Sequence, residues 1–141
     1  MNVDLIITAL GKIGLHEVSG AGDSPEILKM ALEAGFPEYL HDDTAWCSMF
    51  ANWVAKECGY RASNKLNARS WLIVGEEVVT PVMGDVAVLW RDNPQSWQGH
   101  IGFFIREDGH SIYLLGGNQG DSVSIMAFDR TRVLGYRRLI K

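Results

Sequence analysis

The stretch HDDTAWCSMFANWVAKECG, residues 41–59, decides the fold because it is the clearest helix in the sequence. Its large apolar side chains recur every three or four residues and make a broad stripe that favours burial. Asp42, Asp43 or Thr44 is expected to cap the start of the helix, where acidic side chains also suit the positive end of its dipole. Gly59 is placed to end it. The stripe, which predicts a helix at the centre of the core, consists of Trp46, Met49, Phe50, Trp53 and Val54.

Cys47 falls in the first turn of this predicted helix, whichever residue caps it. Unsatisfied backbone N–H groups and the helix dipole favour a thiolate there, so we expect a lowered pKa and a nucleophilic sulfur. The same N–H groups are able to hold a developing oxyanion. The alternative is that Cys47 is an ordinary small buried residue, as most free cysteines are.

The two cysteines of the chain, Cys47 and Cys58, are predicted to be free thiols. On one continuous helix, eleven positions with a rise of about 1.5 Å each separate them by about 16 Å. Bridged cysteines have Cα atoms no more than roughly 7 Å apart. Cys58 lies in the last turn, at the negative end of the dipole, which disfavours a thiolate, so we assign it to packing.

The apolar spacing changes once along the chain, near Gly75. Before that point it is helical, with one amphipathic stretch around residues 3–10 and another around residues 27–32. Ser24 and Pro25 supply an N-cap and a first helical residue for the second stretch. The first half of the chain is therefore predicted to be helical.

After Pro81 the pattern shifts to short β-rich runs bounded by glycine and polar turns. The runs are Asp85–Trp90, His100–Arg106, Ser111–Leu115, Ser122–Phe128 and Val133–Leu139. They follow one another too closely to leave room for crossover helices, so the strands should pair antiparallel. The sequence therefore predicts an α+β architecture, with helices first and the sheet second.

Length and composition predict a single globular domain over residues 1–141. The net charge of −4 provides no field that would attract nucleic acid or anionic lipid, and we expect neither as a partner. The C-terminal basic residues alternate with apolar ones, which favours a last strand with a solvated face. Asp4 stands where a signal peptide needs basic residues, and no apolar window reaches about 18 residues. We therefore expect synthesis in the cytoplasm without a signal peptide, and no membrane insertion.

His100 is the predicted general base among the four histidines of the chain. A general base needs a rigid position near the nucleophile, whereas His16, His41 and His110 lie in segments typical of loops or turns. His100 opens a strand, and Gly102 on the same face leaves space for another element, such as the start of the cysteine-bearing helix. The alternative is that His100 is an ordinary solvated or packed strand residue.

Asn118 is the predicted orienting residue for that base. The strand that begins at Ser111 ends just before Asn118. Pairing with the preceding strand through the turn at 108–109 brings Asn118 near the level of His100. An amide oxygen there would accept a hydrogen bond from one imidazole nitrogen and fix the tautomer, as a Cys-His-Asn triad needs. The alternative for Asn118 is a turn residue that tolerates a positive φ.

Six motifs, taken in order, give the chain a resemblance to a known family. They are DDTAWCSMFANWV, NARSWL, PVMGDVAVLW, GHIGFF, LLGGNQ and RVLGYRR. In this order they resemble the phage and bacterial peptidoglycan hydrolases of the CHAP and NlpC/P60 superfamily, specifically a compact CHAP-like branch. The resemblance runs from about Leu15 to the end of the chain.

The resemblance implies a papain-like fold, with N-terminal helices packed on a C-terminal antiparallel sheet of about five to six strands. It implies Cys47 as the nucleophile, His100 as the base and Asn118 as the orienting residue, with no cofactor. One departure is Trp46, where many CHAP domains have glutamine, so the second donor to the oxyanion is unassigned. Some members bind calcium through spaced aspartates, and Asp42–Asp43 lacks that spacing, so no metal is expected.

Five further residues are expected to contact substrate from their place in the resemblance. They are Glu17, Asp43, Trp46, Arg69 and Gln119. Each also has a purely structural alternative, which is helix capping for Asp43, the core for Trp46, a turn for Gln119 and surface charge for the other two.

The function that the resemblance implies is hydrolysis of a peptidoglycan amide bond through a thioester acyl-enzyme. The bond would be the N-acetylmuramoyl-L-alanine amide or a peptide bond of the stem or cross-bridge. We expect a monomeric phage or prophage endolysin that reaches the cell wall in the periplasm after holin-dependent release or secretion. The alternatives are a secreted antibacterial amidase toxin, with an immunity protein as partner, and a catalytically silent wall-binding or phage structural module.

Overall fold

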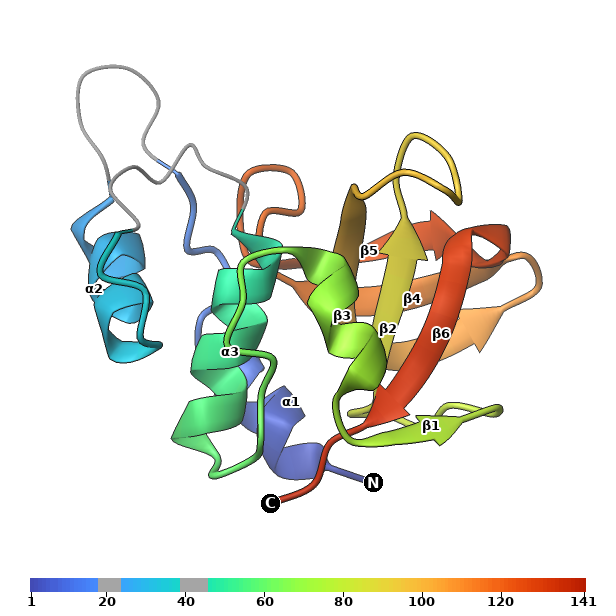
Figure 1. Cartoon of the computed structure of the whole chain (residues 1–141), viewed down its shortest axis with the longest axis horizontal. Coiled ribbons are helices and arrows are strands. Elements are labelled where there is room, and N and C mark those ends of the chain that lie inside the picture. Colours follow the sequence, from blue (N-terminus) through green and yellow to red (C-terminus); the bar gives the residue numbers. More distant parts are fainter. Residues whose placement is uncertain (18–23, 39–45) are drawn as a thin grey trace.

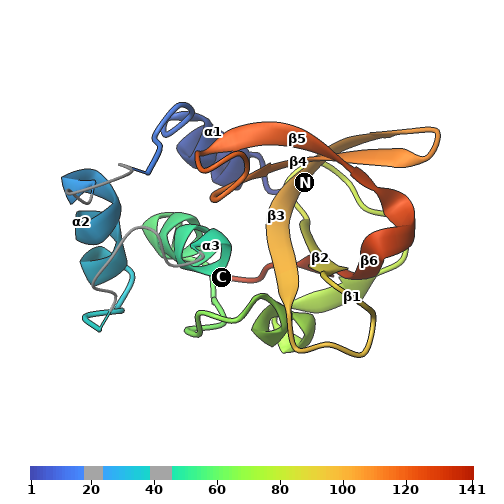
Figure 2. The same cartoon turned by 90° about the horizontal axis from the view of Figure 1, so that it is seen from above.

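The computed structural model describes residues 1–17, 24–38 and 46–141, and its α-helices lie on one side of a sheet (Figure 1). The α-helices are α1 (Val3–Leu10), α2 (Pro25–Glu33) and α3 (Cys47–Glu57), and two 3₁₀-helices are η1 (Ala68–Ile73) and η2 (Arg130–Arg132). Helix α3 lies between α2 and the sheet, and α1 contacts both α3 and the sheet (Figure 2). The predicted helical first half is confirmed for the described residues.

The first two helices lie where the sequence predicts them, and each has both buried and exposed apolar residues. The Ser24 hydroxyl accepts a hydrogen bond from the Ile27 N–H at 3.4 Å, and Pro25 opens α2. In α1 the buried residues are Leu5, Ile6 and Ala9, whereas Ile7 is exposed. The helix is so short and so apolar that its periodicity did not determine which side would be covered.

Helix α3 is the central helix, and its start differs from the prediction. Its N-cap is Trp46, which forms no side-chain capping bond, so Cys47 is the first helical residue. The predicted caps at 42–44 lie outside the described residues. At the other end, Gly59 has a φ of 79° and follows the C-cap residue Cys58, as predicted. Every residue from Cys47 to Ala55 is buried, because α1, α2 and the sheet surround the helix.

The sheet has six antiparallel strands in the order β1-β6-β2-β3-β4-β5. The strands are β1 (Glu76–Val78), β2 (Val86–Trp90), β3 (Gly99–Asp108), β4 (Ser111–Gly116), β5 (Ser124–Asp129) and β6 (Val133–Arg138). The α+β class and all five predicted strands are confirmed. Strand β1 was missed because it has only three residues, two of them exposed glutamates, and so shows no alternation of apolar and polar residues.

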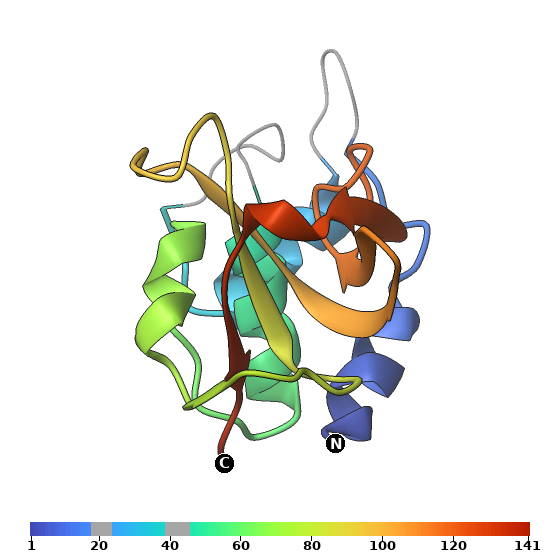
Figure 3. The same cartoon turned by 90° about the vertical axis from the view of Figure 1, so that its right-hand side faces the viewer.

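The two faces of the sheet contact separate apolar clusters. One face packs on α3, which lies behind the strands in Figure 3, and contributes Ile101 and Phe103 to the main core. The sheet curves (Figure 2), and residues of its other face, including Leu89, Phe104 and Leu114, form a second, smaller cluster. The alternation along β3 therefore has both faces buried, and residues at the start of β3 lie next to the beginning of α3.

Asp85 joins the start of β2 to the end of β6. Its carboxylate is fully buried and accepts from Arg138 Nε at 2.9 Å and Nη2 at 2.8 Å. The Val82 N–H donates to the same carboxylate at 2.8 Å. A buried charge requires such compensation, and this ion pair raises the pKa of Arg138. The pair links β2 to β6, and on its other side β2 pairs with β3 in a register that aligns Leu89 with His100.

Candidate active site

Cys47 and His100 line one pocket, at the start of α3 and the start of β3. The pocket has a volume of about 250 Å³. Its other lining residues come from the end of β2, the β4–β5 loop, β5 and η2, and they are Arg91, Gly99, Asn118, Gln119, Gly120, Asp121, Met126, Phe128 and Arg132. The structure therefore brings together the cysteine, the histidine and the asparagine that the sequence singled out.

Burial, rather than the helix start, dominates the chemistry of the Cys47 thiol. The residue is only 7% exposed, and loss of hydration raises the pKa of Cys47. Backbone N–H groups of Ile101, Ser48 and Cys47 itself face the sulfur and act in the opposite direction, as does the charge of Arg91. The predicted lowering of this pKa is thus wrong in sign. At neutral pH Cys47 is a thiol in the substrate-free protein.

His100 is held by Gln119 in a single tautomer. His100 Nε2 lies 2.9 Å from Gln119 Oε1. The Gln119 amide nitrogen donates to the carbonyl oxygens of Leu114 at 3.0 Å and Ser124 at 2.8 Å, so the amide cannot be reversed without placing acceptor against acceptor. His100 Nε2 must therefore carry the proton. In the neutral ring Nδ1 is left with the lone pair.

The charge state of His100 is also fixed by its surroundings. Burial lowers the pKa of His100 to about 4, and the positive charges of Arg132 and Arg91 act in the same direction. The hydrogen bond to Gln119 opposes this shift. The ring also stacks on Phe128, with centroids 5.0 Å apart. At neutral pH the pocket is therefore lined by a neutral imidazole and a neutral thiol.

The orienting contact predicted for Asn118 is made instead by its neighbour Gln119. Continuing the register beyond the pair Phe103 and Leu115 brings position 118 level with His100, as predicted. The chain has already turned there, because Asn118 has a φ of 57°. This conformation makes Asn118 a turn residue on the pocket wall and directs the next side chain to the imidazole. The hydrogen bond to His100 thus comes from a residue predicted only as a substrate contact.

Gly102 was expected to leave space for the start of the cysteine-bearing helix, but another glycine has that role. A Cβ at Gly102 would lie 2.9 Å from Leu114 Cβ and 3.3 Å from Gln119 Oε1, so this glycine admits β4 and the orienting glutamine, not the start of α3. It is Gly117 that admits the helix, since a Cβ there would lie 2.7 Å from Phe50 Cβ and 2.8 Å from the Trp46 ring. The β4–β5 loop lies against α3 through that glycine.

Three other residues predicted to contact substrate form structural contacts. Glu17 Oε1 accepts from Trp46 Nε1 at 2.7 Å, and Trp46 itself is fully buried. Arg69 donates to three carbonyl oxygens of the segment 93–98, which it holds against η1. None of the three is among the described residues that line the pocket. Asp43, the remaining predicted contact, lies outside the described residues.

Two arginines at the pocket were missed in the sequence. Arg132 was assigned to the solvated face of a last strand, but it lies in η2 and lines the pocket. Arg91 directly follows β2, the neighbour of the strand that His100 opens. A charged residue at the end of a buried strand, adjacent to a candidate base, was the signal that could have identified Arg91.

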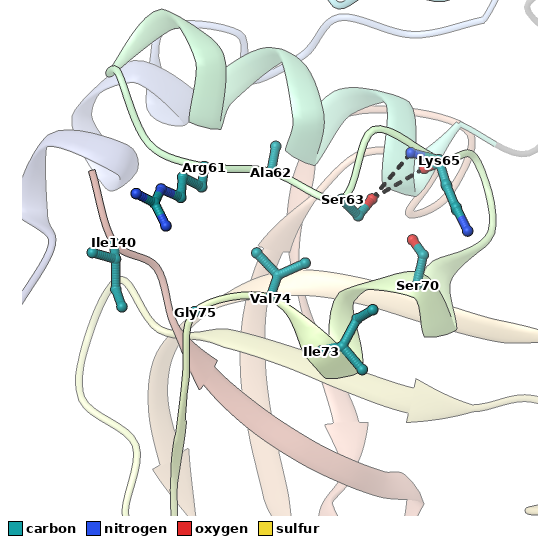
Figure 4. Close-up of a pocket in the computed structure, with 9 residues that line it drawn as sticks. All are labelled: Arg61, Ala62, Ser63, Lys65, Ser70, Ile73, Val74, Gly75 and Ile140. Atoms are coloured by element: carbon teal, nitrogen blue, oxygen red, sulfur yellow. Dashed lines mark hydrogen bonds between the residues drawn. The ribbon is translucent and has the colours of Figure 1, made fainter.

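A larger cavity, of about 440 Å³, lies between the segment 61–65, η1 and the C-terminal segment (Figure 4). Its two serine hydroxyls are bonded to nearby backbone, with Ser63 Oγ 3.3 Å from Lys65 O and Ser70 Oγ 2.6 Å from Asn67 O. Neither serine has a histidine partner among the lining residues. Size alone therefore does not make this cavity the reactive one.

The described residues contain no cluster of three or more His, Cys, Asp or Glu side chains arranged to bind a metal ion. Within the same part of the chain, no helix has the length and apolar character that crossing a membrane requires.

Comparison with known families identifies one match. The family model of the CHAP domain matches residues 39–118, which include Cys47, His100 and Asn118. Gln119, which bonds the imidazole, lies one residue beyond the matched segment. No curated protein matches the chain.

Proposed function

The chain belongs to the CHAP-domain family, and from this premise we propose that it hydrolyses an amide bond of peptidoglycan with Cys47 as nucleophile and His100 as general base. Membership of the family indicates a peptidoglycan hydrolase, either an amidase or an endopeptidase. The observation that carries the assignment of residues is the fixed tautomer of His100, which leaves the lone pair on Nδ1, in a pocket that the buried Cys47 also lines. A base in that state is able to accept the thiol proton at neutral pH.

In the first half of the reaction, the Cys47 sulfur attacks the scissile carbonyl carbon while His100 Nδ1 takes the thiol proton. The carbonyl oxygen becomes an oxyanion near the backbone N–H groups of Cys47 and Ser48, which belong to the first turn of α3. His100 then gives its proton to the leaving amine. The C–N bond breaks, and the acyl group remains on Cys47 as a thioester.

In the second half, a water molecule replaces the amine. His100 Nδ1 takes a proton from the water as its oxygen attacks the thioester carbon. The C–S bond breaks, the sulfur recovers the proton from the imidazolium, and a carboxylic acid is released. Gln119 keeps Nε2 protonated in both halves, so the same nitrogen accepts and returns each proton.

Burial of both groups fits this general-base sequence better than a resting thiolate–imidazolium pair. Two charges in a dry site cost several kcal/mol each unless they are compensated. Here the pKa of the thiol is raised and that of the imidazole is lowered, so charge separation is deferred until the sulfur attacks. Positive charge from Arg91 supports the sulfur as it becomes anionic.

The test is digestion of purified peptidoglycan sacculi, with the released fragments identified by mass spectrometry. We expect the wild-type protein to create one new amine and one new carboxyl group per cut, and these groups will identify the bond. A His100→Asn variant, which removes the base, should release no fragments while keeping its helical and sheet content by circular dichroism. Fragment release at the wild-type rate by this variant, or intact sacculi after wild-type treatment, would contradict the proposal.

For the biological setting we propose a phage or prophage endolysin that acts on the cell wall as a monomer. A secreted antibacterial toxin would use the same chemistry. A holin encoded beside this chain would support the first setting, and an encoded immunity protein that blocks fragment release would support the second.

A further inference from the structure

We propose that Arg91 and Arg132 form a carboxylate-binding subsite beside Cys47 and His100, so that the enzyme prefers a stem peptide with a free carboxylate next to the scissile bond over the same peptide with a carboxamide. This inference rests on the proposed function and names the class of substrate for it. Both arginines line the pocket that contains the cysteine and the histidine. They come from separate elements, the end of β2 and η2, and meet at this site.

The Arg132 guanidinium is fixed in place without using its terminal nitrogens. Its Nε donates to the Trp90 carbonyl oxygen at 3.1 Å. The guanidinium carbon lies 5.6 Å from the centroid of the Phe128 ring and 6.0 Å from that of Trp90. Phe128 in turn stacks on His100. The aromatic contacts thus hold a forked donor next to the base, with geometry suited to a carboxylate.

Among the described residues neither arginine forms a direct ion pair, although, beside hydrogen bonds from Thr131, the charge of Arg132 lowers the pKa of the Asp129 carboxyl. Arg138 by contrast is bound to the buried Asp85, and Arg137 donates to two backbone carbonyls. Among the described residues, the carboxylate that lines the pocket is Asp121, which forms no ion pair with either arginine. The described residues that line the pocket carry two positive charges and one negative charge, and so contribute a net positive field toward an incoming ligand.

This field would work against catalysis if the substrate were uncharged. Both arginines oppose formation of the imidazolium that the first step requires. A bound carboxylate would neutralise them, make His100 a stronger base and complete the site only when the correct substrate is present. Among the described residues, the titratable and charged groups that line the pocket with His100 are Cys47 from α3, Arg91 after β2, Asp121 in the β4–β5 loop and Arg132 in η2.

The test compares two muropeptides that differ only in a free carboxylate or a carboxamide next to the scissile bond. For wild-type protein we expect kcat/KM to be about tenfold to a hundredfold higher for the carboxylate. In the Arg91→Gln, Arg132→Gln and double variants, the ratio of the two values should fall toward one. Arg106→Gln, at an arginine paired with Asp108 away from the pocket, should keep the wild-type ratio.

A second measurement separates charge recognition from a merely structural role. With the carboxylate substrate, the low-pH limb of kcat should lie at higher pH than that of kcat/KM, because the bound anion raises the pKa of His100 in the complex. The carboxamide should show no such separation. An unchanged ratio in the double variant, or in Arg91→Gln alone if the double variant does not fold, overturns the inference. If wild-type protein cleaves neither muropeptide, the proposed function fails, and the inference fails with it.

Discussion

The two ends of helix α3 each carry a cysteine, and they differ in almost everything except the thiol. Cys47 opens the helix and faces β3, where backbone N–H groups are directed at its sulfur. Cys58 closes the helix and faces α1, where its sulfur lies 3.1 Å from Thr8 Oγ1 and donates to the Asp4 carbonyl at 3.5 Å. Donation to a carbonyl requires the protonated thiol. The elements packed against each end, and not the residue type, decide which cysteine has a base within reach.

The different roles of Cys47 and Cys58 can be tested by removing each sulfur in turn. Cys47→Ala should lower kcat on peptidoglycan by about 10⁴-fold or more, because no other cysteine, serine or threonine among the described residues lines the pocket with His100. Cys58→Ala should leave kcat within about twofold and lower the free energy of unfolding by about 1 kcal/mol, because it loses only local contacts. Fragment release and urea unfolding measure the two effects. A dead Cys58→Ala variant with native stability would refute the assignment.

A second test distinguishes the roles of the Gln119 and Asn118 side-chain amides, which line the pocket at the Cys47 end of α3. Gln119→Leu should lower kcat by about a hundredfold, because nothing then keeps His100 Nε2 protonated and Nδ1 free. Asn118→Gly, which preserves the positive φ while removing the amide, should lower kcat by less than about fivefold. Steady-state kinetics on one soluble muropeptide provide both values. The opposite ranking would return the orienting role to Asn118.

His100, which lines the pocket at the Cys47 end of α3, should make the free energy of unfolding depend on pH. Because the pKa of His100 is about 4 in the folded protein and near 6.5 when unfolded, the unfolded chain binds the proton more tightly between these values. The stabilisation is complete above pH 6.5 and is lost as the pH falls toward 4, by up to about 3 kcal/mol. Urea unfolding of wild-type protein and His100→Asn at pH 7 and pH 4.5 isolates this contribution. Equal losses in both proteins would show that other groups cause it.

The smallest effect is expected where the β4–β5 loop meets the start of α3. Gly117→Ala should lower the free energy of unfolding by about 1–3 kcal/mol, because the new Cβ overlaps Phe50 and the Trp46 ring. Gly11→Ala is the control, since its φ of −62° suits alanine and its nearest neighbour is a backbone oxygen 3.3 Å away. Thermal unfolding of both variants measures the difference. A neutral Gly117→Ala would mean that the loop is able to move away from the helix.

Local patterns in the sequence predicted the elements and singled out Cys47 and His100, whereas contacts between distant segments remained unpredicted. Cys47 at a helix start and His100 at a strand start follow from periodicity and position, and the structure places both in one pocket. Whether Asn118 or Gln119 contacts His100 depends on the φ of Asn118. Extrapolating the pairing of β3 and β4 does not specify that angle. The wrong direction of the Cys47 pKa has the same origin, because its burial comes from surrounding elements that helix position alone does not reveal.

The raised pKa of Cys47 also bears on how the sulfur withstands oxidation. Peroxide attacks the thiolate and converts it to sulfenic acid, whereas the protonated thiol reacts slowly. A buried thiol beside a neutral imidazole exposes little thiolate until a substrate carbonyl draws the proton away. The surroundings that keep Cys47 protonated should therefore also protect the proposed nucleophile, and we expect the proposed activity to persist without an added reductant.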